Sequence, residues 1–440
     1  MIDNTRLEQI EDALIAIVKC DVVPALGCTE PISLALASAT AAKFLGKMPE
    51  RIEGKVSPNL MKNGLGVAVP GTGMVGLPIA AAIGALGGDP DAGLEVLKNI
   101  TAEQVACAKN LLAEKRVTVG IQQTEHILYS EATLFARNEQ GGEDRVKVAI
   151  QDQHTNIILI EKNGEVLHQK AKTDQSAVDP YVVFQTVKAR EIFEFCQQVA
   201  AEKIRFIEQA GALNQALSQE GLRADYGLHI GRTLRKQVGS GLLSDDLLSK
   251  IMIETTAASD ARMGGATLPA MSNSGSGNQG IAATMPVVVV ADYLKADEDK
   301  RLRALFLSHL MAIYIHSKLP KLSALCAVTT ASMGSCAGIA YLLTGKFETV
   351  SMGICSMIGD ISGIICDGAA NSCAMKVSTS VASGYKSVLM AMDETHVTGN
   401  EGIVEHDLDR TIDNLCAIAS KSMQHIDRQV IEIMVSKPCP

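Results

Sequence analysis

The sequence predicts an α+β protein, in which an N-terminal domain with helices and an antiparallel sheet precedes a large all-helical domain. In residues 116–170 apolar and polar residues alternate, which is the period of a β-strand. Asn163-Gly164 lies between two apolar runs there, a strong signal for a β-hairpin. Further along, the alternation stops, and helical segments with charged faces follow. We therefore expect an α+β domain over 1–172 and a helical domain over 173–440.

The elements can be assigned in order along the chain. Pro24 ends an amphipathic first helix, Thr29 can cap a second one, and Pro31 suits its first turn. Short strands are expected in RIEGKVSPN and GLGVAVPG, and a small-residue helix in GLPIAAAIGALGG. The remaining helices are expected over residues 102–114, 187–219, 243–260 and 300–318.

The composition is that of a globular protein with a small-molecule partner. The chain has 440 residues, of which 47% are hydrophobic and 20% charged, and its net charge is -9. This charge, with no dense run of Lys or Arg, argues against nucleic-acid binding. The first helix lacks the pattern of a signal peptide, so we expect a cytoplasmic protein with reduced cysteines. The sequence leaves a homodimer open.

Two uncharged segments, 263–291 and 322–345, are longer than the roughly 20 residues that span a bilayer. They consist mostly of Gly, Ala, Ser, Thr, Met and Asn, which partition poorly into lipid. We expect closely packed core helices and no membrane contact, with a membrane protein as the alternative.

Glycine-rich motifs raise the question of a nucleotide site. Gly-x-Gly-x-x-Gly matches begin at Gly71 and Gly275. The fingerprint needs a parallel βαβ unit, whereas the sheet predicted after the first match is antiparallel. We expect a tight connection there, and a nucleotide-dependent or small-molecule-binding protein remains an alternative.

A polar loop before the apolar run at 281–290 is a candidate substrate site. Backbone N–H groups and small donors ahead of a helix suit a carboxylate. The alternative is a helix-breaking connector, and Arg262 upstream either adds a charged donor or lies on a helix face. The candidate residues of this loop are Ser272, Asn273, Ser274, Gly275 and Asn278.

Three cysteines, Cys336, Cys366 and Cys373, lie in surroundings rich in Gly, Ser and Ala with almost no charge. Thiolates in such turns can hold an iron-sulfur cluster, and buried unreactive thiols are the other interpretation. Cys326 and Cys355 lie in apolar runs and are expected to be core thiols.

These motifs carry a resemblance to known families. The string SMGSCAG with the two later cysteines, and the stretch ARMGGATLPAMSNSGSG, resemble the catalytic domain of iron-sulfur-dependent L-serine dehydratases. PALGCTEPISLALA with GLGVAVPGTGMVGLPIAAAIGALGG is similar to the related L-cysteine desulfidases. The resemblance implies β-elimination from L-cysteine, or from L-serine by the same mechanism, without pyridoxal phosphate. It also implies that Cys336, Cys366 and Cys373 hold a 4Fe-4S cluster.

The resemblance places a substrate-binding stretch at Cys28, Thr29 and Glu30, where serine dehydratases have a histidine that this chain lacks. Because a helix start lowers the pKa of a thiol, we expect Cys28 to act as a catalytic thiolate. Cys439 is either a removable fourth cluster ligand or part of a disordered tail. The substrate site is expected between the two domains.

Overall fold

A computed structural model describes residues 2–139, 141–170, 180–320 and 322–437. The expected domain boundary at 172/173 and Cys439 lie outside these residues. The helices are α1 (Asn4–Asp21), α2 (Thr29–Leu45), α3 (Pro58–Gly64), α4 (Leu77–Gly87), α5 (Ala102–Ala113), α6 (Ala189–Gln198), α7 (Ala201–Ile204), α8 (Glu208–Arg223), α9 (Ile230–Gly239), α10 (Leu247–Met263), α11 (Gly277–Leu294), α12 (Glu298–His316), α13 (Ala327–Thr344), α14 (Phe347–Ile361), α15 (Cys373–Met392), α16 (Leu408–Ser420) and α17 (Gln424–Ser436).

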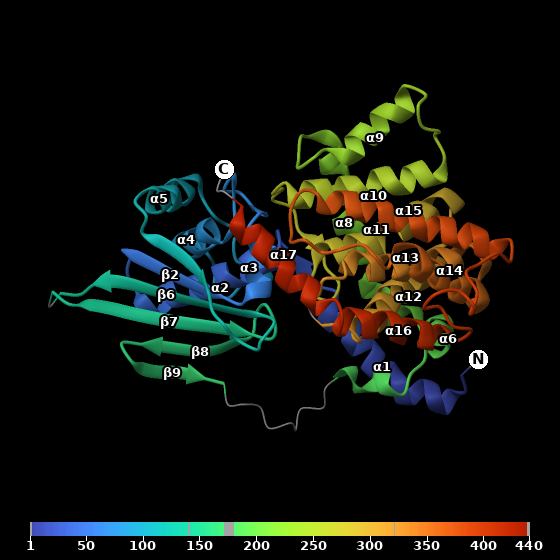
Figure 1. Ribbon diagram of the computed structural model, residues 1–440, viewed down its shortest axis with the longest axis horizontal. Coiled ribbons are helices and arrows are strands. Elements are labelled where there is room, and N and C mark those ends of the chain that lie inside the picture. Colours follow the sequence, from blue (N-terminus) through green and yellow to red (C-terminus); the bar gives the residue numbers. More distant parts are fainter. Residues whose placement is uncertain (1, 140, 171–179, 321, 438–440) are drawn as a thin grey trace.

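The main sheet has the strand order β5-β2-β6-β7-β8-β9, in which only β2 and β5 are parallel neighbours. Helices α2 and α4 cover it on one face (Figure 1). This N-terminal sheet and the helices that follow confirm the α+β class. The strands are β1 (Pro24–Ala25), β2 (Arg51–Val56), β3 (Ala68–Val69), β4 (Met74–Val75), β5 (Val117–Ile121), β6 (Tyr129–Arg137), β7 (Glu143–Gln151), β8 (Ile157–Lys162), β9 (Glu165–Gln169) and β10 (Ala270–Met271).

Local signals located several elements correctly. Asn163 and Gly164 both have positive φ and join β8 to β9, as a two-residue hairpin requires. Gly71 lies in the turn of the β3–β4 hairpin, so the first glycine motif is a tight connection. The helix that begins after Cys28 differs in one detail: Cys28 has the extended backbone of the N-cap, so Thr29 is the first helical residue, and its hydroxyl donates to the carbonyl of Gly275.

The single helix expected over 187–219 is divided into α6, α7 and α8. The guanidinium of Arg303, on α12, donates to the carbonyls of Cys196, Gln197 and Val199 at the end of α6. These carbonyls lack partners within the helix, so the arginine stabilises the break. A tertiary contact, absent from any local pattern, therefore ends this helix.

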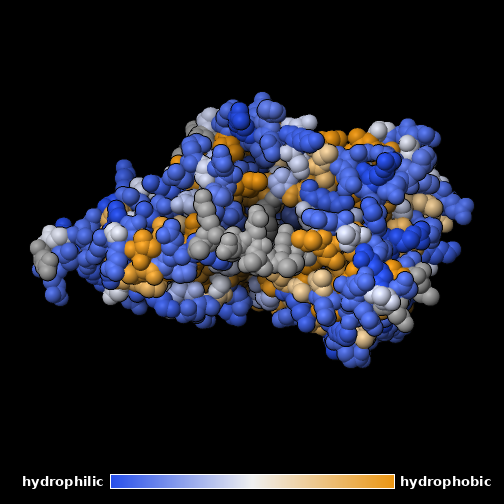
Figure 2. Space-filling model, turned by 90° about the horizontal axis from the view of Figure 1, so that it is seen from below, coloured by the Kyte–Doolittle hydropathy of each residue, from blue (hydrophilic) through white to orange (hydrophobic). Residues whose placement is uncertain are grey.

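Helix α13 lies at the centre of the helical part and contacts α11, α12, α14 and α15 (Figure 1). Its length and composition would allow it to cross a membrane, but 78% of that window is buried inside the protein. A Cβ at Gly334 would lie 2.3 Å from the carbonyl oxygen of Ser308, so only glycine allows α12 this close. The face in Figure 2 is largely hydrophilic, with separate hydrophobic patches. This is the packing of a core helix in a soluble protein.

Two helices connect the ends of the chain to distant parts. The buried face of α1 joins the core of the helical part. Helix α17 crosses from the helical part to α3 in the sheet-bearing part (Figure 1). There the buried Lys62 ammonium lies 2.6 Å from the Asp427 carboxylate of α17 and 3.2 Å from the carbonyl oxygen of Cys366. These contacts connect the two parts of the protein next to Cys366.

Candidate active site

Two loops that are far apart in the sequence meet through the short β1–β10 pair. Pro24 is opposite Met271, and the hydroxyl of Ser272 donates to the carbonyl of Val23. The start of α2 and the polar loop at 272–278 therefore lie side by side. This contact brings the two predicted substrate-binding segments together.

Three cysteines converge near these loops. An antiparallel bridge between Leu325 and Ile365 places Cys326 and Cys366 on either side of it, with Cys366 donating its N–H to Ala324. Cys373 begins α15 after a tight turn. Burial is the main cause that raises the pKa of Cys326, and the charges of Cys366 and Cys373 raise it further. The three thiols are therefore close enough to interact.

The structure corrects the cysteine set expected from the motifs. Cys336 lies in the third turn of α13, ten residues beyond Cys326, which is roughly 15 Å along the helix. Its sulfur faces Gly353 of α14, where a Cβ would approach it to 2.7 Å. Burial raises the pKa of the Cys336 thiol, and the neighbouring Cys355 raises it further. Cys336 is thus a core thiol, and Cys326, expected in the core, lies with Cys366 and Cys373 instead.

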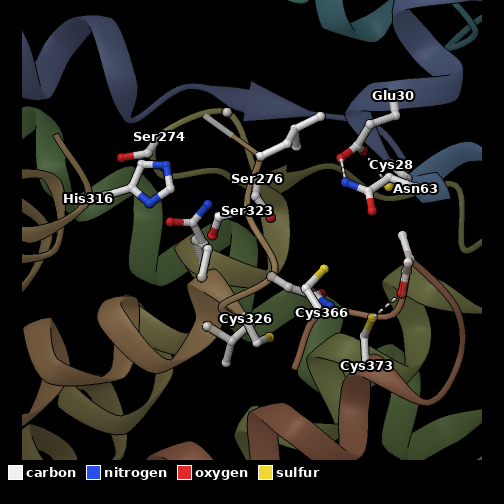
Figure 3. A pocket seen from close by; sticks show the side chains of 18 of the residues that line it. Cys28, Glu30, Asn63, Ser274, Ser276, His316, Ser323, Cys326, Cys366 and Cys373 are labelled. Atoms are coloured by element: carbon white, nitrogen blue, oxygen red, sulfur yellow. Dashed lines mark hydrogen bonds between the residues drawn. The ribbon is translucent and has the colours of Figure 1, made fainter. Parts of the chain in front are cut away.

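The three thiols line a cavity of about 100 Å³ between the sheet-bearing part and the helical part (Figure 3). Such a volume is on the scale of a ligand with a few non-hydrogen atoms. Cys28 and Glu30 lie across the pocket from Cys366 and Cys373 (Figure 3). The other polar residues that line it are Asn63, His154, Arg262, Ser274, Ser276, Asn278, Gln279, His316 and Ser323.

Four helices direct their N-termini at this pocket. Cys28, Ser276 and Cys326 are the N-caps of α2, α11 and α13, and Cys373 is the first residue of α15. The first N–H groups of a helix have no partner within it and carry partial positive charge. The arrangement therefore favours anions, such as thiolates or a carboxylate, without a cluster of lysines.

Cys28, Glu30 and Asn63 form a hydrogen-bonded group. The Cys28 thiol donates to Glu30 Oε2 at 2.9 Å, and Asn63 Nδ2 donates to Glu30 Oε1 at 3.1 Å. The expectation of a low thiol pKa was wrong. Burial raises the pKa of Cys28 well above its usual value and Glu30 raises it further, although Arg262 opposes them. Cys28 is therefore a protonated thiol that donates a hydrogen bond to Glu30.

Arg262 is a buried cation at the pocket, near the end of α10. Its Nε donates to the carbonyl of Gly27, and its side chain packs on Gly277, where a Cβ would come within 2.2 Å of Nε. From the sequence, Arg262 could either add a charged donor to the polar loop or lie on a helix face. Close packing on a glycine fixes the guanidinium beside the start of α11.

The remaining predicted residues divide into two groups. Ser274, Gly275 and Asn278 line the pocket. Thr29, Ser272 and Asn273 do not line it; their side chains instead hold the loops together. Sequence reasoning missed Asn63, His154 and His316, because each comes from a different element and no local motif marks them, and it missed Gln279 although this residue directly follows the predicted Asn278.

Buried His309 is hydrogen-bonded to the loop at 272–278. The Asn273 side-chain nitrogen lies 3.1 Å from His309 Nδ1, and the Thr284 hydroxyl lies 2.9 Å from His309 Nε2. The Thr284 hydroxyl donates to the carbonyl of Gly280, so it accepts from Nε2. Asn273 donates to Nδ1, which must then be unprotonated. Burial lowers the pKa of His309 to about 3.

This histidine should make the protein less stable in acid. The unfolded chain binds a proton at His309 below about pH 6.5 and the native state does not, so the unfolding free energy falls as pH is lowered from there. Between pH 7 and pH 5 the loss from this group is about 2 kcal/mol. Urea unfolding of wild type and His309→Gln at both pH values measures it. Equal pH dependence in the two proteins would contradict the assignment.

The pocket residues fit an iron-sulfur cluster. Cysteine sulfurs are the usual ligands of iron-sulfur clusters, and Cys326, Cys366 and Cys373 line the same pocket. The starts of α13 and α15 favour the negative charge of thiolates. Among the described residues, no group of His, Cys, Asp and Glu is arranged for a single metal ion. A cluster differs, because each thiolate binds its own iron atom.

Comparisons with known proteins show the family of the chain. The family described as serine dehydratase alpha chain matches residues 91–432. The UPF0597 protein of Actinobacillus pleuropneumoniae serotype 3 (strain JL03) is 71% identical over 430 residues, 98% of both chains. The UPF0597 protein of Dichelobacter nodosus (strain VCS1703A) is 62% identical, covering 99% of both chains. The UPF0597 protein YhaM of Escherichia coli (strain SMS-3-5 / SECEC) is 60% identical, covering 99% of this chain and 100% of its own. The chain therefore belongs to the serine dehydratase alpha chain family, whose name indicates a lyase.

Proposed function

We propose that the protein is an iron-sulfur-dependent lyase that converts L-cysteine to pyruvate, ammonia and hydrogen sulfide. The observation that carries the proposal is the convergence of Cys326, Cys366 and Cys373 on a small pocket that also contains Arg262 and the Cys28–Glu30 pair. This arrangement offers cluster ligands, a cation and a proton-transfer pair around one pocket.

The reaction balances without an added oxidant. The Cα–H bond breaks and its proton passes to a base, and the electron pair forms a Cα–Cβ double bond. The Cβ–S bond breaks, and the sulfur leaves with its electrons and takes up a proton as hydrogen sulfide. The resulting 2-aminoacrylate becomes an imine, which water hydrolyses to pyruvate and ammonia.

The cluster, held by Cys326, Cys366 and Cys373, would supply a Lewis acid for the departing sulfur. Arg262 and the N–H groups at the start of α11 are placed to bind the substrate carboxylate. Glu30 would take the proton of the Cys28 thiol, and the resulting thiolate would then accept the Cα proton.

L-Serine is the second candidate substrate, and the family description favours it. The same side chains would serve the elimination of water instead of hydrogen sulfide. The resemblance of PALGCTEPISLALA to L-cysteine desulfidases favours L-cysteine. We expect the enzyme to act in the cytoplasm.

Protein purified without oxygen should be brown, with the broad visible absorbance of an iron-sulfur cluster, and should release sulfide and pyruvate in equal amounts from L-cysteine. Iron and acid-labile sulfide analysis, with initial rates for L-cysteine and L-serine at matched concentrations, tests this. Colourless protein without iron would overturn the proposal. Faster turnover of L-serine would replace the proposed substrate by the second candidate.

A further inference from the structure

Asn63 presents an unused hydrogen-bond acceptor to the pocket. The residue is only 6% exposed, and its side-chain oxygen Oδ1 is buried with no hydrogen-bond partner among the described residues. Leaving such a group without a partner costs about 1–3 kcal/mol, so a buried orphan acceptor in a ligand pocket needs an explanation.

The orientation of this amide is fixed by its neighbour. Both oxygens of Glu30 are acceptors, so the atom of Asn63 that faces Oε1 at 3.1 Å must be the nitrogen. The oxygen consequently points to the side of the pocket that holds Cys366 and Cys373 (Figure 3). Glu30 therefore acts as the residue that positions the Asn63 oxygen.

Helix α3 holds Asn63 in place from both sides. Lys62, the preceding residue, is anchored to Asp427 and to the carbonyl of Cys366. Gly64, the next residue, packs so tightly on Leu77 that a Cβ would lie 2.5 Å from its side chain. A side chain fixed in this way is suited to recognition, because little further entropy is lost when it binds a ligand.

The geometry points to Asn63 as the residue that recognises the α-ammonium group of the substrate. A neutral acceptor beside the Glu30 carboxylate suits a cationic N–H donor. The carboxylate of the same ligand is left for Arg262 and the start of α11, so the pocket selects molecules that carry both groups. The inference rests on the proposed function in one respect, that the ligand is an amino acid.

The test compares two ligands that differ only in the ammonium group. L-Alanine and propionate both carry a carboxylate, and neither has a β leaving group to lose. Added at equal concentration to the anaerobic holoprotein, L-alanine should raise the Tm and propionate should not, because only bound ligand stabilises the native state. Asn63→Leu should abolish the L-alanine effect and raise KM for L-cysteine by about 10- to 100-fold, the loss of one hydrogen bond to a charged group.

Two variants control the interpretation. Glu30→Gln keeps a side-chain oxygen to which Asn63 Nδ2 can donate, and it should retain the L-alanine effect; if it behaves like Asn63→Leu, the Glu30 carboxylate carries the ammonium recognition and the inference is overturned. Asn59→Leu changes the same residue type on the same helix, outside this pocket, and should behave as wild type. Equal stabilisation of wild type by both ligands also overturns the inference. Discrimination without any sulfide from L-cysteine would support the ammonium site and overturn the proposed reaction.

Discussion

Replacing Cys326 with serine should remove the iron, the brown colour and the turnover of L-cysteine together, with activity falling by more than about 100-fold. Replacing Cys336 with serine should leave all three in place. The reason is geometric: Cys326 is held beside Cys366 by the bridge between Leu325 and Ile365, whereas Cys336 faces Gly353 in the helical core. The expected cost of Cys336→Ser is therefore packing energy, about 1–3 kcal/mol of unfolding free energy.

The measurement is iron content and visible absorbance of anaerobically purified variants, followed by initial rates. Cys355→Ser is a matched control, because Cys355 is another buried helix thiol, and it should keep its iron. Cys366→Ser and Cys373→Ser should behave as Cys326→Ser does. If Cys336→Ser lost its iron and Cys326→Ser kept it, the ligand set inferred from the motifs would be restored.

Elements that depend on neighbouring residues could be predicted from the sequence. The Asn163-Gly164 hairpin, the strand expected in RIEGKVSPN and the helix expected in GLPIAAAIGALGG are all present in the structure, the last two as β2 and α4. Their signals are turn residues that need positive φ, period-two alternation and helix ends, which act within a few residues. The break in the helix expected over 187–219 could not be predicted, because it depends on an arginine more than a hundred residues away.

In the site, too, local features could be predicted from the sequence, whereas features that depend on distant contacts could not. The two loops were located because Gly-rich and polar stretches before a helix have a local meaning. Choosing between Cys326 and Cys336 needed the pairing of residue 325 with residue 365, a contact across forty positions. Both cysteines lie in apolar, small-residue surroundings, so composition did not separate them. Asn63 was missed because its importance depends on where its oxygen points, which only the tertiary structure determines.

Replacing Cys28 with serine should leave the iron and the colour unchanged while turnover of L-cysteine falls by about 100- to 10,000-fold, the usual contribution of a positioned proton-transfer group. Cys28 lies across the pocket from Cys366 and Cys373 (Figure 3), and its proton is directed to Glu30. A serine hydroxyl can keep this hydrogen bond, but its oxygen is far less acidic than sulfur and gives up its proton less readily. The fold should therefore persist while proton transfer fails.

The comparison needs a thiol that is removed without touching the pocket. Cys107 on α5 is partly exposed and lies outside it, so Cys107→Ser should turn over L-cysteine as wild type does. Iron analysis and initial rates of the two variants are measured side by side. Normal turnover by Cys28→Ser would reduce Cys28 to a packing residue at the start of α2. Loss of iron would instead make it a cluster ligand, and the base would then have to be sought among the other side chains of the pocket, with His154 and His316 first.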